Sequence, residues 1–129
     1  MNIGEIARET GVNSKTIRYY ESIGLIPPAE RQANGYRAYM PNDVATLRFI
    51  SRARALGFSL DEVRGLLTLW HDKGRASADV KSMALEHVTK IEIRIAELEN
   101  VKQTLLDLTR RCHGDDRPDC PIVEDLARN

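Results

Sequence analysis

Two cysteines near the end of the sequence have the residue type and spacing best suited to chemistry. Cys112 and Cys120 enclose the run His-Gly-Asp-Asp-Arg-Pro-Asp, in which Gly114 and Pro118 favour a tight loop that brings the two sulfurs together. Thiolates are soft ligands, and two opposed thiolates suit a linear site for a soft monovalent d¹⁰ ion. The pattern therefore favours a monovalent metal, while a redox dithiol and two idle thiols stay open as alternatives.

Other metal centres fit this cysteine loop (residues 112–120) less well. Zn²⁺ takes four ligands in tetrahedral geometry, and the loop supplies only two cysteines. His113 is a candidate third donor, but next to a cysteine on so short a loop we expect it to point to solvent. An iron–sulfur cluster needs four cysteines, so the two in this sequence exclude it.

The segment that must position this loop is predicted to be one long helix over residues 77–111. Apolar residues recur at spacings of three and four, and neither Gly nor Pro interrupts them. The repeat comprises Val88, Ile91, Ile95, Leu98, Val101, Leu105 and Leu108. At about 1.5 Å per residue the helix is a rod of roughly 50 Å. Its apolar side needs a partner, and a second copy of the same helix predicts a two-fold homodimer. After the loop, residues 121–126 predict a short amphipathic helix that folds back as a lid.

The first 24 residues predict two short helices around a tight turn. Asn2 caps the first helix, Gly11 breaks it, and Asn13 or Ser14 caps the second, which stops at Gly24. In a helix-turn-helix, such a second helix lies in the major groove of DNA. The DNA contacts expected from it are Lys15, Thr16, Arg18, Tyr19 and Tyr20. A helical hairpin with a solvated basic face is the alternative.

Residues 30–39 predict a β-hairpin around Asn34-Gly35, which after a helix-turn-helix is typical of a wing. Arg31, Tyr36 and Arg37 are expected to contact phosphates there. A second helical pair follows over residues 41–70, with a capping box that begins at Ser59. Arg54, on the first helix of this pair, is expected to add a DNA backbone contact or to belong to a solvated charged face.

Charge is unevenly distributed along a chain whose formal net charge is zero. Residues 1–75 carry 11 Lys and Arg against 8 Asp and Glu, and residues 76–129 carry 8 against 11. The first part is therefore the better place for a polyanion. No apolar run approaches the roughly 20 residues that cross a bilayer, and no signal segment opens the chain. We expect a cytoplasmic protein without a membrane partner, whose cysteines are reduced thiols.

Several short runs are spread over the first 60 residues: Ile3-Gly4-Glu5-Ile6-Ala7, Gly11-Val12, Thr16–Glu21, Gly24-Leu25-Ile26, Gly35-Tyr36-Arg37 and Gly57-Phe58-Ser59-Leu60. Together they resemble the MerR family of transcription regulators. The resemblance implies a fold dominated by α-helices, with a winged helix-turn-helix head that carries a small β-hairpin wing. It also implies a long dimerisation helix in an antiparallel coiled coil. In such regulators the dimer binds a promoter with overlong spacing between its two polymerase elements, and effector binding makes it distort the DNA so that RNA polymerase reads both.

The cysteine loop is similar to that of the copper(I)-responsive, CueR/HmrR-like branch of this family. In related regulators of divalent metals a further cysteine begins the dimer helix and reaches the partner's loop, and here Ser77 holds that position. A hydroxyl is a poor ligand for a soft cation. The resemblance therefore implies Cu(I) as the effector, with Ag(I) and Au(I) as mimics.

The predicted organisation has four parts. Residues 1–70 form the DNA-binding domain, 71–76 a hinge with Gly74 as its flexible point, 77–111 the dimerisation helix, and 112–129 the metal loop with a short helix. No Ser/His/Asp set and no phosphate-binding glycine loop is present, so we do not expect an enzyme. A regulator of another effector (a divalent metal or thiol oxidation) and a coiled-coil adaptor stay open as alternatives.

Overall fold

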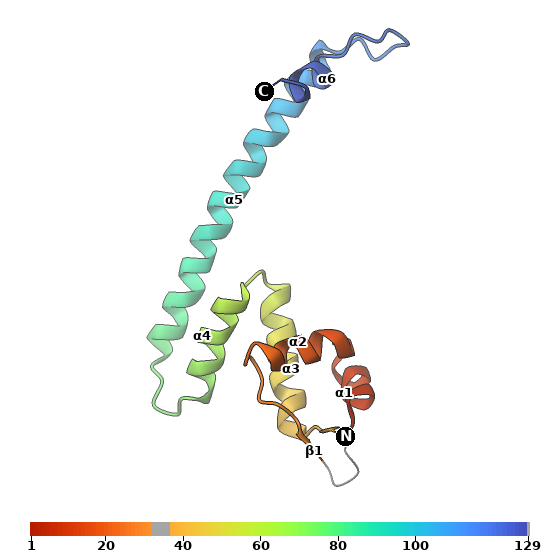
Figure 1. Cartoon of the computed structure of the whole chain (residues 1–129). Coiled ribbons are helices and arrows are strands. Elements are labelled where there is room, and N and C mark those ends of the chain that lie inside the picture. Colours follow the sequence, from red (N-terminus) through yellow and green to blue (C-terminus); the bar gives the residue numbers. More distant parts are fainter. Residues whose placement is uncertain (32–36, 129) are drawn as a thin grey trace. The chain divides into compact units, whose positions relative to one another are not determined.

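The computed structural model describes residues 1–31 and 37–128 (Figure 1). The chain forms two compact units, a head of residues Met1–Ala76 and an arm of residues Ser77–Asn129. The head contains α1 (Ile3–Thr10), α2 (Ser14–Ser22), β1 (Glu30–Arg31), β2 (Arg37–Ala38), α3 (Pro41–Ala55) and α4 (Leu60–His71). The arm contains α5 (Ser77–Arg111) and α6 (Pro121–Leu126). The predicted fold class, a helix-turn-helix head with a long helix, is confirmed.

Local capping explains how the helix-turn-helix begins and turns. The Asn2 side chain accepts a hydrogen bond from the Glu5 backbone N–H at 2.8 Å, and Asn13 accepts one from the Thr16 N–H at 2.8 Å. These bonds satisfy backbone donors that the first turn of each helix leaves free. Gly11 ends α1 with φ of 75°, a left-handed conformation that glycine adopts without steric penalty.

The two strands form a small antiparallel ladder at the base of the predicted wing. Glu30 lies opposite Ala38, and Arg31 lies opposite Arg37. The predicted Asn34-Gly35 turn and Tyr36 lie outside the described residues.

The head has its own hydrophobic core, contributed by all four of its helices. Its fully buried side chains are Ile6, Ile17, Ile26, Leu47, Ile50 and Val63. One polar pair is enclosed with them, because the buried Tyr39 hydroxyl donates a 2.5 Å hydrogen bond to the Glu21 carboxylate. At the edge of the core, Phe49 and Trp70 stack with ring centroids 4.5 Å apart.

Arg64 joins α4 to the end of α2. Arg64 on α4 donates to the carbonyl oxygens of Ile23 at 2.8 Å and Gly24 at 3.2 Å, which follow α2. These are carbonyls that the end of α2 leaves without helical partners. Ser59 and Glu62 form the predicted capping box at the start of α4.

The segment after α4 contains a hydrogen-bonded turn. The Gly74 N–H donates to the Asp72 carboxylate at 2.8 Å, and Arg75 donates to the Trp70 carbonyl oxygen at 3.1 Å. Gly74, the expected flexible point of the hinge, takes part in this turn through its N–H.

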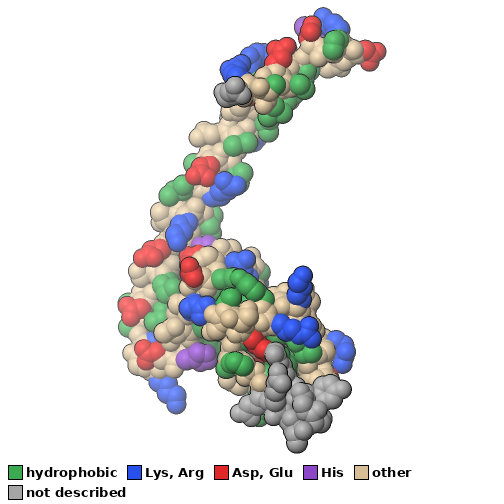
Figure 2. Space-filling view, in the orientation of Figure 1, with side chains coloured by type: hydrophobic (Ala, Val, Ile, Leu, Met, Phe, Trp, Pro, Cys, Tyr) green, Lys and Arg blue, Asp and Glu red, His purple; other side chains and the backbone are tan. Residues whose placement is uncertain are grey.

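The long helix α5 leaves most of its apolar repeat exposed. In the single chain the exposed large apolar side chains on α5 are Leu85, Val88, Ile91, Ile93, Ile95, Leu98, Val101, Leu105 and Leu106. Figure 2 shows apolar side chains along the rod. Leu108, by contrast, is buried close to the end of α5, where α6 packs back onto the helix. Among the described residues, no helix is long and apolar enough to span a membrane.

Candidate metal centre and DNA-binding surface

The structure brings the two predicted thiols together. Cys112 directly follows α5, and its N–H donates to the Thr109 carbonyl oxygen at 3.2 Å. Cys120 is the N-cap residue of α6, which Pro121 begins with the backbone angle that a first helical turn requires. The two sulfurs lie 3.8 Å apart, and both cysteines are free and half-buried.

The start of α6 favours the ionised form of one of these thiols. The backbone N–H of Val123 lowers the pKa of Cys120 below its ordinary value, and the Ile122 N–H and the Cys112 thiol act in the same direction. Desolvation and the negative charge of Glu124 oppose this lowering of the pKa. The thiolate is the form of a cysteine that binds metals, and these N–H groups favour that form of Cys120.

The residues between the two cysteines hold the loop in shape. Gly114 takes a φ of 66°, a left-handed conformation that glycine adopts without steric penalty. Arg117 contacts the Asp115 carboxylate through two side-chain nitrogens, Nε and Nη2, each 2.9 Å from Oδ2. The Arg117 backbone N–H adds a third contact to Asp115, at 3.0 Å from Oδ1. The loop is therefore organised by its own side chains.

The two thiols are close enough to share one metal ion. Metal–thiolate bonds of about 2.3 Å place two sulfurs that share one ion no more than about 4.6 Å apart, and the observed 3.8 Å lies within that limit. Throughout the described part of the chain, no group of three or more His, Cys, Asp and Glu residues is arranged to hold a metal ion. His113 is exposed and does not complete such a group.

Ser77, the predicted selectivity residue, lies at the opposite end of α5 from the cysteine loop. It is the first residue of this 35-residue helix, so about 50 Å of helix separates it from Cys112 of the same chain. A single chain therefore does not bring Ser77 to the thiols.

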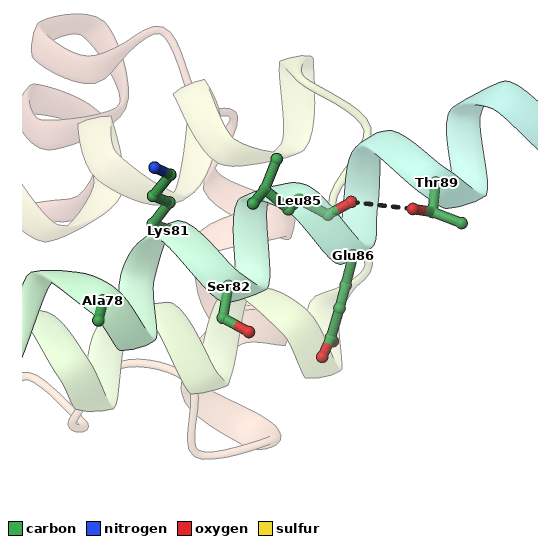
Figure 3. A pocket seen from close by; sticks show the side chains of 6 residues that line it. All are labelled: Ala78, Lys81, Ser82, Leu85, Glu86 and Thr89. Carbon is green, nitrogen blue, oxygen red and sulfur yellow. Dashed lines mark hydrogen bonds between the residues drawn. The ribbon is translucent and has the colours of Figure 1, made fainter.

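A shallow hollow follows Ser77 along one face of α5. Figure 3 shows its lining, which consists of Ala78, Lys81, Ser82, Leu85, Glu86 and Thr89. The Thr89 hydroxyl donates to the Leu85 carbonyl oxygen at 3.2 Å, as Figure 3 also shows. Glu86 is the sole carboxylate in this lining and no thiol is present, so the hollow does not supply a second metal centre.

The predicted DNA-contacting residues on α2 divide into two groups. Lys15, Arg18 and Tyr19 are exposed, and Thr16 is half-buried. Tyr20 instead lies in the hydrophobic core with only 9% of its surface exposed. Its helical neighbours Ile17 and Glu21 are buried on the same face. The position of Tyr20 therefore favours packing of its ring over contact with DNA.

The remaining predicted contacts lie at the wing and on α3. The backbone of Arg31 pairs with that of Arg37 in the β-ladder, while Tyr36 lies outside the described residues. Arg54 is exposed but donates to the Phe58 carbonyl oxygen at 2.7 Å. This bond ties the end of α3 to the turn before α4, so Arg54 has a structural role whatever else it contacts.

Two supporting interactions were missed by the sequence analysis. The contact between Asp115 and Arg117 could have been predicted locally, because an Asp side chain that accepts from the backbone N–H two residues later is typical of a turn. The contacts of Arg64 with residues 23 and 24 join parts of the chain 41 and 40 positions apart, respectively, and no local pattern indicates them.

Comparison with known proteins gives matches along almost the whole chain. Residues 1–69 match the family model described as MerR HTH family regulatory protein, and residues 44–108 match the one described as MerR, DNA binding. The regulator HmrR of Sinorhizobium medicae is 57% identical over 99% of this chain and 87% of its own length. The regulator CueR of Salmonella typhimurium is 45% identical over 98% of this chain and 92% of its own.

A solved structure gives the same picture for the fold. The transcription regulator PbrR691 from Ralstonia metallidurans, in complex with lead(II), matches with a TM-score of 0.85 and 32% identity. The match covers 98% of this chain and 99% of that one.

Proposed function

We propose, starting from the fact that this chain belongs to the MerR family of transcription regulators, that its effector is Cu(I), held by Cys112 and Cys120. As a transcription regulator the protein is not an enzyme, as predicted. One observation carries the choice of effector: two free thiols lie 3.8 Å apart, and in the described residues no third ligand joins them. Soft thiolates in this number suit a monovalent d¹⁰ ion, and Ag(I) and Au(I) act as mimics.

Selectivity against divalent ions follows from the residue at the start of α5. We assign Ser77 of the partner subunit to the vicinity of the cysteine loop, because two α5 helices in antiparallel register bring the first residue of one near the end of the other. A serine hydroxyl does not replace the third thiolate that a divalent soft ion would use. Two thiolates and one monovalent cation leave a net charge of −1, which the free N–H groups at the amino-terminal end of α5 in the partner subunit are suited to stabilise.

Dimerisation in this proposal uses the apolar repeat of α5. Val88, Ile91, Ile95 and Leu98 keep between 42% and 59% of their surface exposed in the single chain. An apolar stripe with this heptad-like spacing is the surface that a two-stranded coiled coil buries. We propose that residues 1–70 bind DNA, that residues 71–76 connect this domain to α5, that residues 77–111 form the dimer and that residues 112–129 bind the metal.

The exposed cations and polar tips of the head provide the DNA contacts. Lys15, Thr16, Arg18 and Tyr19 lie on α2, the helix that enters the major groove in a helix-turn-helix. The wing arginines 31 and 37 add phosphate contacts, which fix the register of the protein on DNA. Lys and Arg side chains are visible on the face of the head in Figure 2.

Control of transcription requires that metal prefer one of two conformations of the DNA-bound dimer. A ligand shifts an equilibrium only through its differential affinity for the two states. Cu(I) therefore binds the activating conformation more tightly than the repressing one. The activating dimer distorts the promoter so that RNA polymerase reads both of its recognition elements.

The test is an anaerobic titration of the fully reduced protein with Cu(I) against a strong competing chelator, with Zn(II) and Pb(II) in parallel. We expect one tightly held Cu(I) per chain, its loss in Cys112→Ser, and weak binding of both divalent ions. Tight Zn(II) or Pb(II) binding, or no retained Cu(I), would leave a MerR-family regulator of a different effector. Promoter binding by Cys112→Ser, measured at a fixed salt concentration, is the control for an intact head.

A further inference from the structure

The two thiols satisfy the requirements of a second reaction, the formation of a bond between them. Their sulfurs are 3.8 Å apart, whereas a disulfide needs about 2.05 Å, so closure requires an approach of about 1.8 Å. Both side chains are half-buried rather than enclosed, which leaves each within reach of a small oxidant. The sequence contains no other cysteine, so within one chain each thiol has a single possible partner.

The loop can make this approach without disturbing a packed core. All seven residues from 113 to 119 are exposed. The hydrogen bonds described for these residues join Asp115 and Arg117 to each other. Gly114 adds a backbone conformation that tolerates a tight reversal. A movement of the loop therefore costs little packing.

We propose that Cys112 and Cys120 also form a reversible intramolecular disulfide when they meet a peroxide, and that the oxidised protein does not bind the metal effector. One thiolate attacks the peroxide O–O bond, becomes a sulfenic acid and releases water once a proton is taken up. The second thiol then attacks that sulfenic sulfur, the S–S bond forms, and a second water leaves. In total two thiols and one hydrogen peroxide give one disulfide and two water molecules, and a dithiol reductant reverses the oxidation by exchange.

The consequence for the metal follows from ligand chemistry and rests on the proposed function. A disulfide sulfur carries no thiolate charge, and the thiolate is the metal ligand. The same two sulfurs therefore serve either reaction but never both. Oxidation makes the regulator unresponsive to metal, and bound metal protects the thiols from oxidation.

The experiment exposes the reduced, metal-free, full-length protein to a modest excess of hydrogen peroxide and follows free thiols, mass and metal retention. We expect the loss of both thiols per chain together, a mass lower by two hydrogens and no covalent dimer. After cleavage before Asp115 or Asp116 the two fragments should stay joined until a dithiol is added. Protein loaded with Ag(I) before treatment should keep both thiols, and the oxidised protein should retain no Ag(I).

The single variants Cys112→Ser and Cys120→Ser are the matched controls, and each should stop at a sulfenic acid without a joined fragment pair. Disulfides between chains, or separate overoxidation of the two cysteines, would overturn the proposal. So would a disulfide that leaves Ag(I) binding intact. If the disulfide forms but the reduced protein retains no Cu(I), the proposed effector fails while the thiol reaction stands. If Cu(I) binds and no disulfide forms, the reverse holds.

Discussion

Replacement of Ile95 by alanine should weaken the dimer, whereas the same replacement at Ile93 should not. Both isoleucines lie on α5, and in the single chain they expose 59% and 56% of their surface, respectively. At about 100° per residue they are separated by roughly 200° around the helix. Only Ile95 belongs to the apolar repeat, so only Ile95 is expected to enter the dimer interface.

The magnitude follows from the area that remains to be buried. Full burial of an isoleucine side chain contributes about 1.5–3 kcal/mol, and 59% of the surface of Ile95 is still exposed in the single chain. Its burial in the dimer is therefore worth about 1–2 kcal/mol per chain, or about 2–4 kcal/mol for the two copies. At about 1.4 kcal/mol per tenfold change, Ile95→Ala should raise the Kd of the dimer by roughly 30- to 700-fold.

Sedimentation equilibrium of the reduced, metal-free protein over a range of concentrations measures this Kd. Alanine is the better helix former, so neither variant should lose α5, and far-ultraviolet circular dichroism verifies this. Ile93→Ala should keep the Kd within about twofold of the parent, as expected for an exposed surface change. Equal effects of the two variants, or a weaker dimer only in Ile93→Ala, would refute the assignment of the apolar repeat to the interface.

Four further predictions address the metal site and the head. Cys112→Ser should abolish induction by Cu(I) in a reporter assay, because a single thiolate remains, and should leave promoter binding intact. Ser77→Cys should add a third thiolate and raise the affinity for Zn(II) or Hg(II), measured by chelator competition; an unchanged metal profile would contradict the account of selectivity. Val123→Pro removes the backbone N–H that lowers the pKa of Cys120, so that pKa should rise. As the solution is acidified, the Cys120 thiolate should then be protonated, and metal affinity should begin to fall, at a higher pH than in the parent protein. Ultraviolet absorbance of the thiolate follows that titration. Gly11→Ala should lower the free energy of unfolding of the head by about 1–2 kcal/mol, since φ is 75° there and the added Cβ meets no neighbour within 4 Å; chemical denaturation measures the change.

Two of these predictions have close controls within the chain. Ser82→Cys places a new thiol five residues beyond Ser77 on the same helix, and it should leave the metal profile unchanged. Gly74→Ala changes a glycine whose φ is outside the left-handed region, so it should destabilise the head less than Gly11→Ala does.

Features set by neighbouring residues were predictable from the sequence. Asn2, Asn13 and Ser59 cap their helices as expected, because an N-cap depends on a side chain and a backbone N–H only three residues apart. The apolar repeat of α5 likewise indicated a continuous helix, since period and the absence of Gly and Pro are local properties. The burial of Tyr20 could also have been predicted from the sequence, because Tyr20 shares a helical face with Ile17.

Features that depend on three-dimensional placement were not predictable in the same way. The sequence places the two cysteines eight positions apart, but the 3.8 Å between their sulfurs depends on the conformation of Gly114 and the contacts of Arg117. The hydrogen bonds of Arg64 depend on how α4 packs beside the end of α2. The hydrogen bond from Arg54 to the Phe58 carbonyl oxygen was not predictable from the expected exposure of Arg54, since an exposed arginine can still donate hydrogen bonds within the fold.

The head, which contains the stacked pair of Phe49 and Trp70, differs from the arm in its intrinsic fluorescence. Every Phe, Tyr and Trp of the sequence lies within residues 1–76, and Trp70 is its single tryptophan. Its ring lies 4.5 Å from that of Phe49, with an angle of 6° between the planes. Intrinsic fluorescence therefore arises from the head alone, and the arm that carries the thiols emits nothing. A change in Trp70 emission when metal is added is thus a label-free signal that the effect of binding has reached the head.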